Sequence, residues 1–348
     1  MHTIKNRASE LTKRYPVLAR LFADFAAKNL PLDALFLEHL QKGLEERSRE
    51  LPPEKIVNTY LKDYEIPQIV LFDILANRFP LVTEAQALVH RTLSSEAKGC
   101  RHLVIIDLGI GRGVQLMRML QHLQAHLSLS SITVIGVELI REALEHTTQL
   151  MEQATKQAPG ELRFIPLNST LESLQRNEVA QYIPASCDFV FVNASLSLHH
   201  LQQQDERKIL FQKVSSWKPD LFTIIEPNAA TFTEHFETRL YNAAEHFNAL
   251  YNFTDTLELK PEEKRTLKMF FSNDFFDPLA LPEAHRFEKL ERAERWIEYG
   301  DQAGLRSFAL DEWAKPIHIR EIQISGSPQP FINFNYRGVD LLATIALS

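Results

Sequence analysis

The sequence predicts an α/β fold in which a Rossmann-like core, built on a central and mostly parallel sheet, carries an N-terminal helical cap and a helical insertion. From about residue 100 onward, short runs of Val, Ile, Leu and Phe alternate with longer amphipathic stretches, as in parallel sheets covered by helices on both faces. In the first hundred residues and between 230 and 300, apolar positions instead recur at helical spacing.

The helical cap is predicted over residues 1–98. Leu18, Leu21, Phe22 and Phe25 stand at i, i+3, i+4 and i+7, which places them on one face of a helix. The same spacing returns after a pair of prolines that interrupts it. The segment is therefore predicted to form several helices whose apolar faces pack against one another.

The core is predicted to span residues 99–348 and to begin with five apolar runs that read as buried strands. These runs are 102–106, 132–137, 162–165, 189–192 and 221–225. The helical, aromatic-rich block at 230–300 is expected to be an insertion that contributes to the cap. Strand-like segments then return at 318–324 and 332–345.

Composition and charge limit the function classes. With 348 residues, 45% of them hydrophobic, the chain has material for about two domains with sizeable cores. A net charge of -7 predicts no direct nucleic-acid binding. No signal peptide and no apolar run of about 18 residues is visible, so no membrane association is expected. Cys100 and Cys187 lack disulfide or zinc-ligand spacing, which favours a cytoplasmic location and predicts no metal site.

The sharpest local signal is a strand that runs into a glycine turn and then into a helix. Asp107 lies near the end of the strand, Gly109, Gly111 and Gly113 follow at every second position, and the helix begins near Val114. Such glycines permit positive φ and close approach of a ligand, while amides at the helix start face it. These four residues are predicted to bind a cofactor, and a structural tight turn is the alternative.

Polar residues that end the second and third strands extend the predicted cofactor site. Glu138 stands where a Rossmann-like fold places the carboxylate that accepts hydrogen bonds from ribose hydroxyls. Asn168 and Ser169 are placed to meet an adenine amino group. The alternatives are that Glu138 caps the following helix and that Asn168 or Ser169 is an ordinary N-cap.

Candidate catalytic residues follow the fourth and fifth strands. The segment 198–201 reads Leu-His-His-Leu, and a histidine there can act as a general base, orient a substrate or simply hydrogen-bond at the helix start. Because adjacent side chains diverge on a helix, we expect at most one of His199 and His200 to face the site. Glu226 is expected to hold substrate or raise the basicity of an imidazole, and its alternative is an ion pair with Arg239.

Taken in order, these motifs resemble the GRAS-domain family, first known as plant transcriptional regulators and also found in bacteria. The likeness runs over roughly residues 55–347. The matching segments are Phe72-Asp73-Ile74-Leu75-Ala76-Asn77, Val104-Ile105-Ile106-Asp107, Val192-Asn193 with Leu198-His199-His200-Leu201, Thr223-Ile224-Ile225-Glu226-Pro227-Asn228, Phe236-Glu237-Thr238-Arg239-Leu240, Arg292-Ala293-Glu294-Arg295-Trp296 with Ala303-Gly304-Leu305, and Tyr336-Arg337-Gly338.

The glycine loop also resembles the first motif of class I S-adenosylmethionine methyltransferases. With the loop and Glu138 both present, the resemblance points to a bacterial branch of the GRAS family in which a methyltransferase-like cofactor pocket is intact. It implies a class I methyltransferase-type core, S-adenosylmethionine as cofactor and S-adenosylhomocysteine as product.

From this resemblance we expect a methyltransferase that transfers a methyl group to an oxygen or nitrogen of a small-molecule substrate, aligned in a groove between cap and core. The alternative is a non-catalytic module for ligand binding or protein interaction. Asn193 joins the predicted cofactor-binding residues. The predicted substrate-binding residues are Asn77, Asn228, Arg239 and Trp296.

Overall fold

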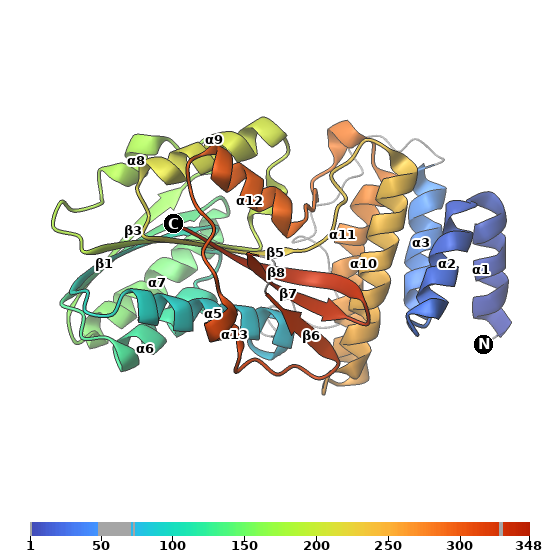
Figure 1. Cartoon of the computed structure of the whole chain (residues 1–348), viewed down its shortest axis with the longest axis horizontal. Coiled ribbons are helices and arrows are strands. Elements are labelled where there is room, and N and C mark those ends of the chain that lie inside the picture. The colour runs from blue at the N-terminus through green and yellow to red at the C-terminus, as the bar shows by residue number, and fades with distance from the viewer. Residues whose placement is uncertain (1, 48–70, 72–73, 327–329) are drawn as a thin grey trace.

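The computed structural model describes residues 2–47, 71, 74–326 and 330–348, and its strands form one central sheet (Figure 1). The strands are β1 (His102–Leu108), β2 (Ser131–Glu138), β3 (Glu161–Asn168), β4 (Phe189–Ser195), β5 (Leu221–Pro227), β6 (Ile322–Ser325), β7 (Phe331–Tyr336) and β8 (Val339–Leu347). Their order is β3-β2-β1-β4-β5-β8-β7-β6. The first five pair in parallel, and the last three extend the sheet in antiparallel fashion. The predicted α/β, Rossmann-like class with a mostly parallel sheet is confirmed.

Both faces of the sheet are buried, which explains the continuous apolar runs of the sequence. Along β1, Leu103 and Ile105 belong to one hydrophobic cluster, whereas Val104 and Ile106 belong to the other. One face is covered by α5 (Pro80–Glu96), α6 (Val114–His126) and α7 (Arg141–Gln157). The other is covered by α8 (Arg176–Ala180), α9 (Gln204–Ser216) and α12 (Ala293–Gln302) (Figure 1).

A group of helices lies beside the sheet, past β6–β8. It consists of α1 (His2–Arg14), α2 (Val17–Ala27), α3 (Ala34–Arg47), α10 (Phe236–Thr256) and α11 (Pro261–Ala280). The N-terminal helices and the insertion pack together, α3 along α11 and α2 against α10. Helix α5 falls within residues 1–98 but packs on the sheet against β5 and β8. The domain boundary at residue 98 stays a prediction.

Short elements complete the described chain. They are η3 (Ile74–Arg78), η4 (Leu198–His200), η5 (Glu283–His285) and α13 (Asp311–Ala314). A two-residue turn at Arg337 (φ 50°) and Gly338 (φ 78°) joins β7 to β8, as expected for a tight hairpin. None of the helices in the described ranges combines the length and apolar character needed to cross a bilayer.

Candidate functional site

The glycine loop between β1 and α6 adopts the backbone that the sequence predicts. Gly109, Gly111 and Gly113 have φ values of 85°, 56° and 75°. A Cβ at Gly109 would stand 2.6 Å from the Cβ of Ser197, and one at Gly113 would stand 2.8 Å from Cγ2 of Thr147. At Gly111, no described atom lies within 4 Å of that position. Two of the glycines therefore serve packing, whereas Gly111 borders open space.

The Glu138 carboxylate links two loops at this edge. Its Oε2 accepts a hydrogen bond from the Gly111 amide at 2.9 Å, and its Oε1 accepts one from the Ile140 amide at 2.8 Å. Helix α7 begins after Ile140, so this hydrogen bond reaches the residue that precedes the helix and not the amides of its first turn. Each carboxylate oxygen retains a further lone pair, which leaves capacity for ligand hydroxyls.

Apolar side chains stand exposed beside this carboxylate. Leu139 is 62% exposed and Ile140 is 42% exposed, and the two are adjacent in the chain. Sequence reasoning missed both residues. The sequence signal that could have found them is a pair of large aliphatic residues directly after Glu138, the acidic residue that ends β2.

Asn168 and Ser169 organise the neighbouring loop. The Asn168 amide nitrogen donates to the backbone oxygens of Glu138 and Leu139, each at 2.9 Å. The hydroxyls of Ser169 and Ser173 share a hydrogen bond at 3.0 Å. Because α8 begins only at Arg176, neither residue is its N-cap, and that alternative is wrong. Both remain at the open edge, where the adenine prediction is untested.

Asp107 and Asn193 lie inside the sheet, in register on β1 and β4. Asn193 donates to the Asp107 carboxylate at 2.9 Å and accepts from Thr223 of β5 at 3.2 Å. Asp107 is 3% exposed and Asn193 is fully buried, so they brace three strands instead of lining the edge. The pKa of Asp107 is raised to about 7, chiefly by burial. The hydrogen bond from Asn193 opposes this shift, and the charge of Glu138 adds to it.

His199 lies between two carboxylates, and both histidines of the pair reach the same one. Its Nδ1 is 2.5 Å from Oε2 of Glu226, and its Nε2 is 3.2 Å from Oε2 of Glu288. Nδ1 of His200 is 3.4 Å from Oε1 of Glu288. Both histidines therefore face Glu288, and the expectation that at most one of them faces the substrate site stays a prediction. Although successive side chains of the 3-10 turn η4 diverge by about 120°, the two ring centroids lie 4.1 Å apart, and Glu288 contacts both rings.

The Glu226 carboxylate holds His199 in place between the two carboxylates. It is 1% exposed, and its Oε1 accepts hydrogen bonds from the amides of Ser197 and Leu198 at 2.9 and 2.7 Å. Its ion-pair partner is His199, so the alternative pairing with Arg239 is wrong.

The charges around His199 decide which proton state it holds. Burial alone would lower the pKa of His199, but the adjacent Glu226 and Glu288 carboxylates raise it well above its usual value. Burial alone would raise the pKa of Glu288, but the two imidazoles lower it. An imidazole that keeps its proton near neutral pH is a poor general base, so the geometry favours positioning roles. Sequence reasoning missed Glu288 because it lies in an irregular segment with no motif.

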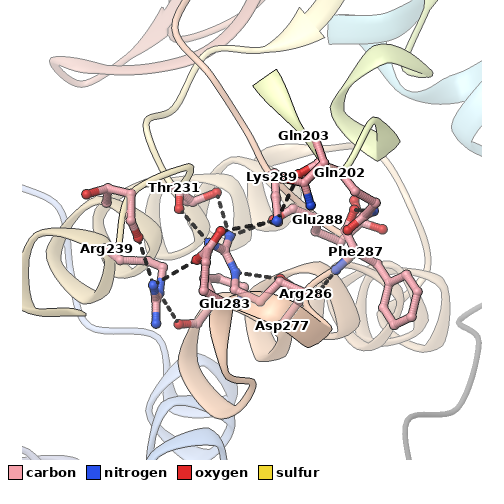
Figure 2. A network of polar contacts seen from close by, with 12 residues as sticks. Gln202, Gln203, Thr231, Arg239, Asp277, Glu283, Arg286, Phe287, Glu288 and Lys289 are labelled. Atoms are coloured by element: carbon pink, nitrogen blue, oxygen red, sulfur yellow. Dashed lines mark hydrogen bonds and ion pairs between the residues drawn. The ribbon is translucent and has the colours of Figure 1, made fainter. Parts of the chain in front are cut away.

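Arg239 is buried in a polar network and is not exposed to a groove (Figure 2). It donates to the backbone oxygens of Pro278 and Thr233 at 2.9 and 2.7 Å and pairs with Glu283 at 3.1 Å. Burial lowers its pKa to about 10, with the Arg286 charge acting in the same direction. Its guanidinium is committed to protein partners, which corrects the prediction that it binds substrate.

Two other predicted substrate ligands are also structural. Trp296 is 1% exposed and stacks on Phe211 with ring centroids 6.3 Å apart. Asn228 is 3% exposed, and its side-chain oxygen accepts from the Ala293 amide at the start of α12. Asn77 is exposed and contacts Arg118 of α6. The geometry therefore leaves only Asn77 of this set accessible.

Comparison with known proteins places the chain in a family. The GRAS domain family model matches residues 23–316. In Arabidopsis thaliana, Scarecrow-like protein 34 is 24% identical over 261 residues, covering 71% of this chain and 41% of the relative. Scarecrow-like protein 1 is 24% identical over 223 residues, covering 57% of this chain and 35% of the relative. The chain thus spans less than half the length of these relatives.

A solved structure shows the same fold. The structure of SCL7 from Oryza sativa superposes with a TM-score of 0.75 at 17% identity, covering 95% of this chain and 94% of that one. A DszA carbon methyltransferase is a weaker match, with a TM-score of 0.47 at 14% identity over 99% of this chain and 70% of that one, too distant to assign a function. By the extent of the family match and the shared fold, this chain belongs to the GRAS domain family.

Proposed function

We propose that this chain binds an S-adenosyl ligand at its glycine loop and uses it to methylate a small molecule. The observation that carries the proposal is the open space at Gly111, directly beside the Glu138 carboxylate. A bare backbone lets a ligand approach closely, and a carboxylate suits ribose hydroxyls. The exposed Leu139 and Ile140 offer an apolar surface to a purine face.

The chain's own residues would hold and orient the ligand. S-adenosylmethionine, when bound, supplies a methyl group on a sulfonium. Ser197 steadies the loop, because its hydroxyl donates to the Leu108 carbonyl at 2.7 Å and its Cβ stands against Gly109. Glu138 ties the loop to the end of β2, so the site is preorganised before binding. Methyl transfer depends chiefly on alignment of donor and acceptor, which a rigid loop supports.

A second candidate is ligand binding without turnover. One observation favours it: the residues predicted to act on substrate, His199, Arg239 and Trp296, are occupied by protein partners. A cytoplasmic location and an origin in the bacterial branch belong to the same proposal as the methyltransferase assignment. The two candidates share the ligand and differ only in methyl transfer.

Calorimetric titration with S-adenosylhomocysteine tests the shared binding step. Gly111→Val should abolish binding, because the side chain fills the open space. Gly99→Val is the matched control, since Gly99 also has positive φ and an open Cβ position but precedes β1 at the opposite strand ends. It should bind as the wild type does. Equal affinity in Gly111→Val and Gly99→Val, or no binding to the wild type, would refute the proposal.

The ribose contact has its own control pair. Glu138→Gln should lose a charge-assisted contact and weaken binding by about 1.5–3 kcal/mol. Glu161→Gln removes an exposed acid at the start of β3 and should leave the affinity unchanged. If the two variants bind alike, Glu138 does not hold the ligand. Formation of S-adenosylhomocysteine from S-adenosylmethionine with candidate acceptors then separates the enzyme from the binding module.

A further inference from the structure

A cluster of ligating atoms lies just after β4, beginning two residues beyond Ser197, the residue that packs on Gly109. It consists of His199, His200 and Glu288, whose imidazole nitrogens and carboxylate oxygens all lie within 4.8 Å of one another. The two rings have centroids 4.1 Å apart and are tilted by 49°, so each presents a different nitrogen to the same carboxylate.

The spacing of these atoms matches a tetrahedral cation. The Glu288 oxygens stand 3.2 Å from Nε2 of His199 and 3.4 Å from Nδ1 of His200. Ligand atoms bound to Zn²⁺ at about 2.0–2.2 Å in tetrahedral geometry are separated by about 3.4 Å. A cation can therefore enter between them with small side-chain adjustments.

Among the residues that the structure describes, one carboxylate oxygen of Glu288 lacks a well-formed hydrogen bond, and its nearest positive group is the His199 imidazole. This oxygen, Oε2, is buried and accepts no hydrogen bond of acceptable geometry within the described residues, although His199 lies nearby. A buried carboxylate oxygen without such a bond is costly unless a cation neutralises it. Lys289, the adjacent cation, points the other way and is held by Glu283 at 3.2 Å and the Gln202 carbonyl at 2.9 Å (Figure 2).

A carboxylate holds His199 in the orientation that is usual for metal-binding histidines. Its Nδ1 is held by Glu226 at 2.5 Å, and Glu226 is itself fixed by two backbone amides. A carboxylate behind a histidine sets its tautomer and directs the other nitrogen to the metal, and a cation bound at Nε2 displaces the proton that His199 holds without it. The His200 side chain is 41% exposed, which provides an entry path and an open position for water.

We propose that His199 Nε2, His200 Nδ1 and the Glu288 carboxylate bind one divalent transition-metal ion, with Zn²⁺ as the best fit and Glu226 orienting His199. Two imidazoles and one carboxylate suit Zn²⁺, whereas Mg²⁺ and Ca²⁺ prefer oxygen ligands alone. Three protein ligands with an open fourth position are typical of sites where the metal contacts a substrate or water. The site stands independently of the proposed methyl transfer.

The test titrates chelator-treated, full-length protein with Zn²⁺ against a chromophoric competitor. We expect one equivalent to bind, with affinity reduced at least about 100-fold in His200→Ala and about 10–100-fold in Glu226→Gln. His285→Ala is the matched control, because it removes an exposed histidine three residues before Glu288 and should bind as the wild type does.

Titration with Co²⁺ supplies a second readout that a merely structural role would not change. The proposal expects intense visible absorption from a four-coordinate ion in the wild type and in His285→Ala, and its loss in His200→Ala and Glu288→Gln. Circular dichroism of each variant checks that the fold is retained. No stoichiometric binding to the wild type, or equal binding by His200→Ala and His285→Ala, would overturn the proposal.

Discussion

At the residue scale, Asp107 shows how burial links a side chain to pH. It lies within the sheet, and its carboxyl has a pKa near 7 in the folded chain against 3.8 for an ordinary aspartate. Between these values the folded protein holds a proton that the unfolded chain has released. Its contribution to stability is therefore present below pH 4 and lost as pH rises toward 7.

Asp107→Asn should remove this dependence while keeping an oxygen that can accept from Asn193. Relative to the variant, the wild-type free energy of unfolding should fall between pH 4 and 7, by about 1.4 kcal/mol at most for each pH unit. Denaturant unfolding at several pH values measures the difference. Asp205→Asn, at an exposed carboxyl, is the control and should show no such trend. Parallel curves for wild type and Asp107→Asn would contradict the account.

Residue roles were predictable only where the backbone dictated them. The three loop glycines have the positive φ that their spacing indicates, because no other residue type adopts that conformation so readily. Arg239 and Trp296 were mistaken for substrate ligands because their type suits binding equally well. Their actual partners, such as Glu283 and Phe211, lie at distances along the chain that no local pattern reveals.

At the element scale, the glycine loop is held by helix α7 as well as by its own conformation. The Thr147 hydroxyl donates to the Gly111 carbonyl at 2.8 Å, and its methyl group stands against Gly113. Thr147 therefore contacts both the open glycine, Gly111, and a packed one, Gly113, whereas the other packed glycine, Gly109, lies against Ser197.

Alanine substitutions should separate these two positions. Gly111→Ala should cost about 1–2 kcal/mol of unfolding free energy for its left-handed backbone alone. Gly113→Ala should cost roughly 1–3 kcal/mol more, because its Cβ meets Thr147. Adding Thr147→Ser, which removes that methyl group, should recover part of the extra loss. Equal costs at the two glycines, or no recovery in the double variant, would show that Thr147 does not hold the loop.

Helices and strands with a regular apolar pattern could be predicted from the sequence, and short irregular elements could not. Four of the five parallel strands, β1, β2, β4 and β5, follow from continuous apolar runs, since a strand buried on both faces leaves no other pattern. The edge strand β3 instead mixes exposed and buried residues. The turn η4 was expected to be the start of a helix, because three residues carry no periodicity. The carboxylate that His199 and His200 share belongs to Glu288, far along the chain, and was not accessible from the sequence.

At the scale of the whole molecule, the buried lysine Lys268 joins segments far apart in the chain. Lys268 of α11 is 7% exposed and pairs with Asp33, before α3, at 2.6 Å and with Asp255, near the end of α10, at 2.7 Å. The sequence indicated that an insertion lies near the N-terminal helices but not which helices meet. That pairing depends on tertiary contacts without a local signature.

Lys268→Met should destabilise the molecule by about 3–5 kcal/mol, because it leaves the Asp33 carboxylate buried without its cation. Adding Asp33→Asn should restore part of the loss. Lys315→Met is the control, since its pairing with Glu312 is solvent-exposed and should contribute less than about 1 kcal/mol. Thermal and denaturant unfolding give the comparison. A loss no larger than in Lys315→Met would show that this ion pair does not hold the helices together.

The central claim, that the open glycine loop and Glu138 form an S-adenosyl site, is tested most directly by a crystal structure with S-adenosylhomocysteine. We predict a ribose hydroxyl within about 3.2 Å of the Glu138 carboxylate and the ligand against the backbone of Gly111. The distances from the ligand sulfur to His199 and His200 would then show whether methyl transfer can occur beside them. A ligand bound elsewhere, or a Glu138 carboxylate that contacts only the Gly111 and Ile140 amides while ligand occupies the crystal, would contradict the claim.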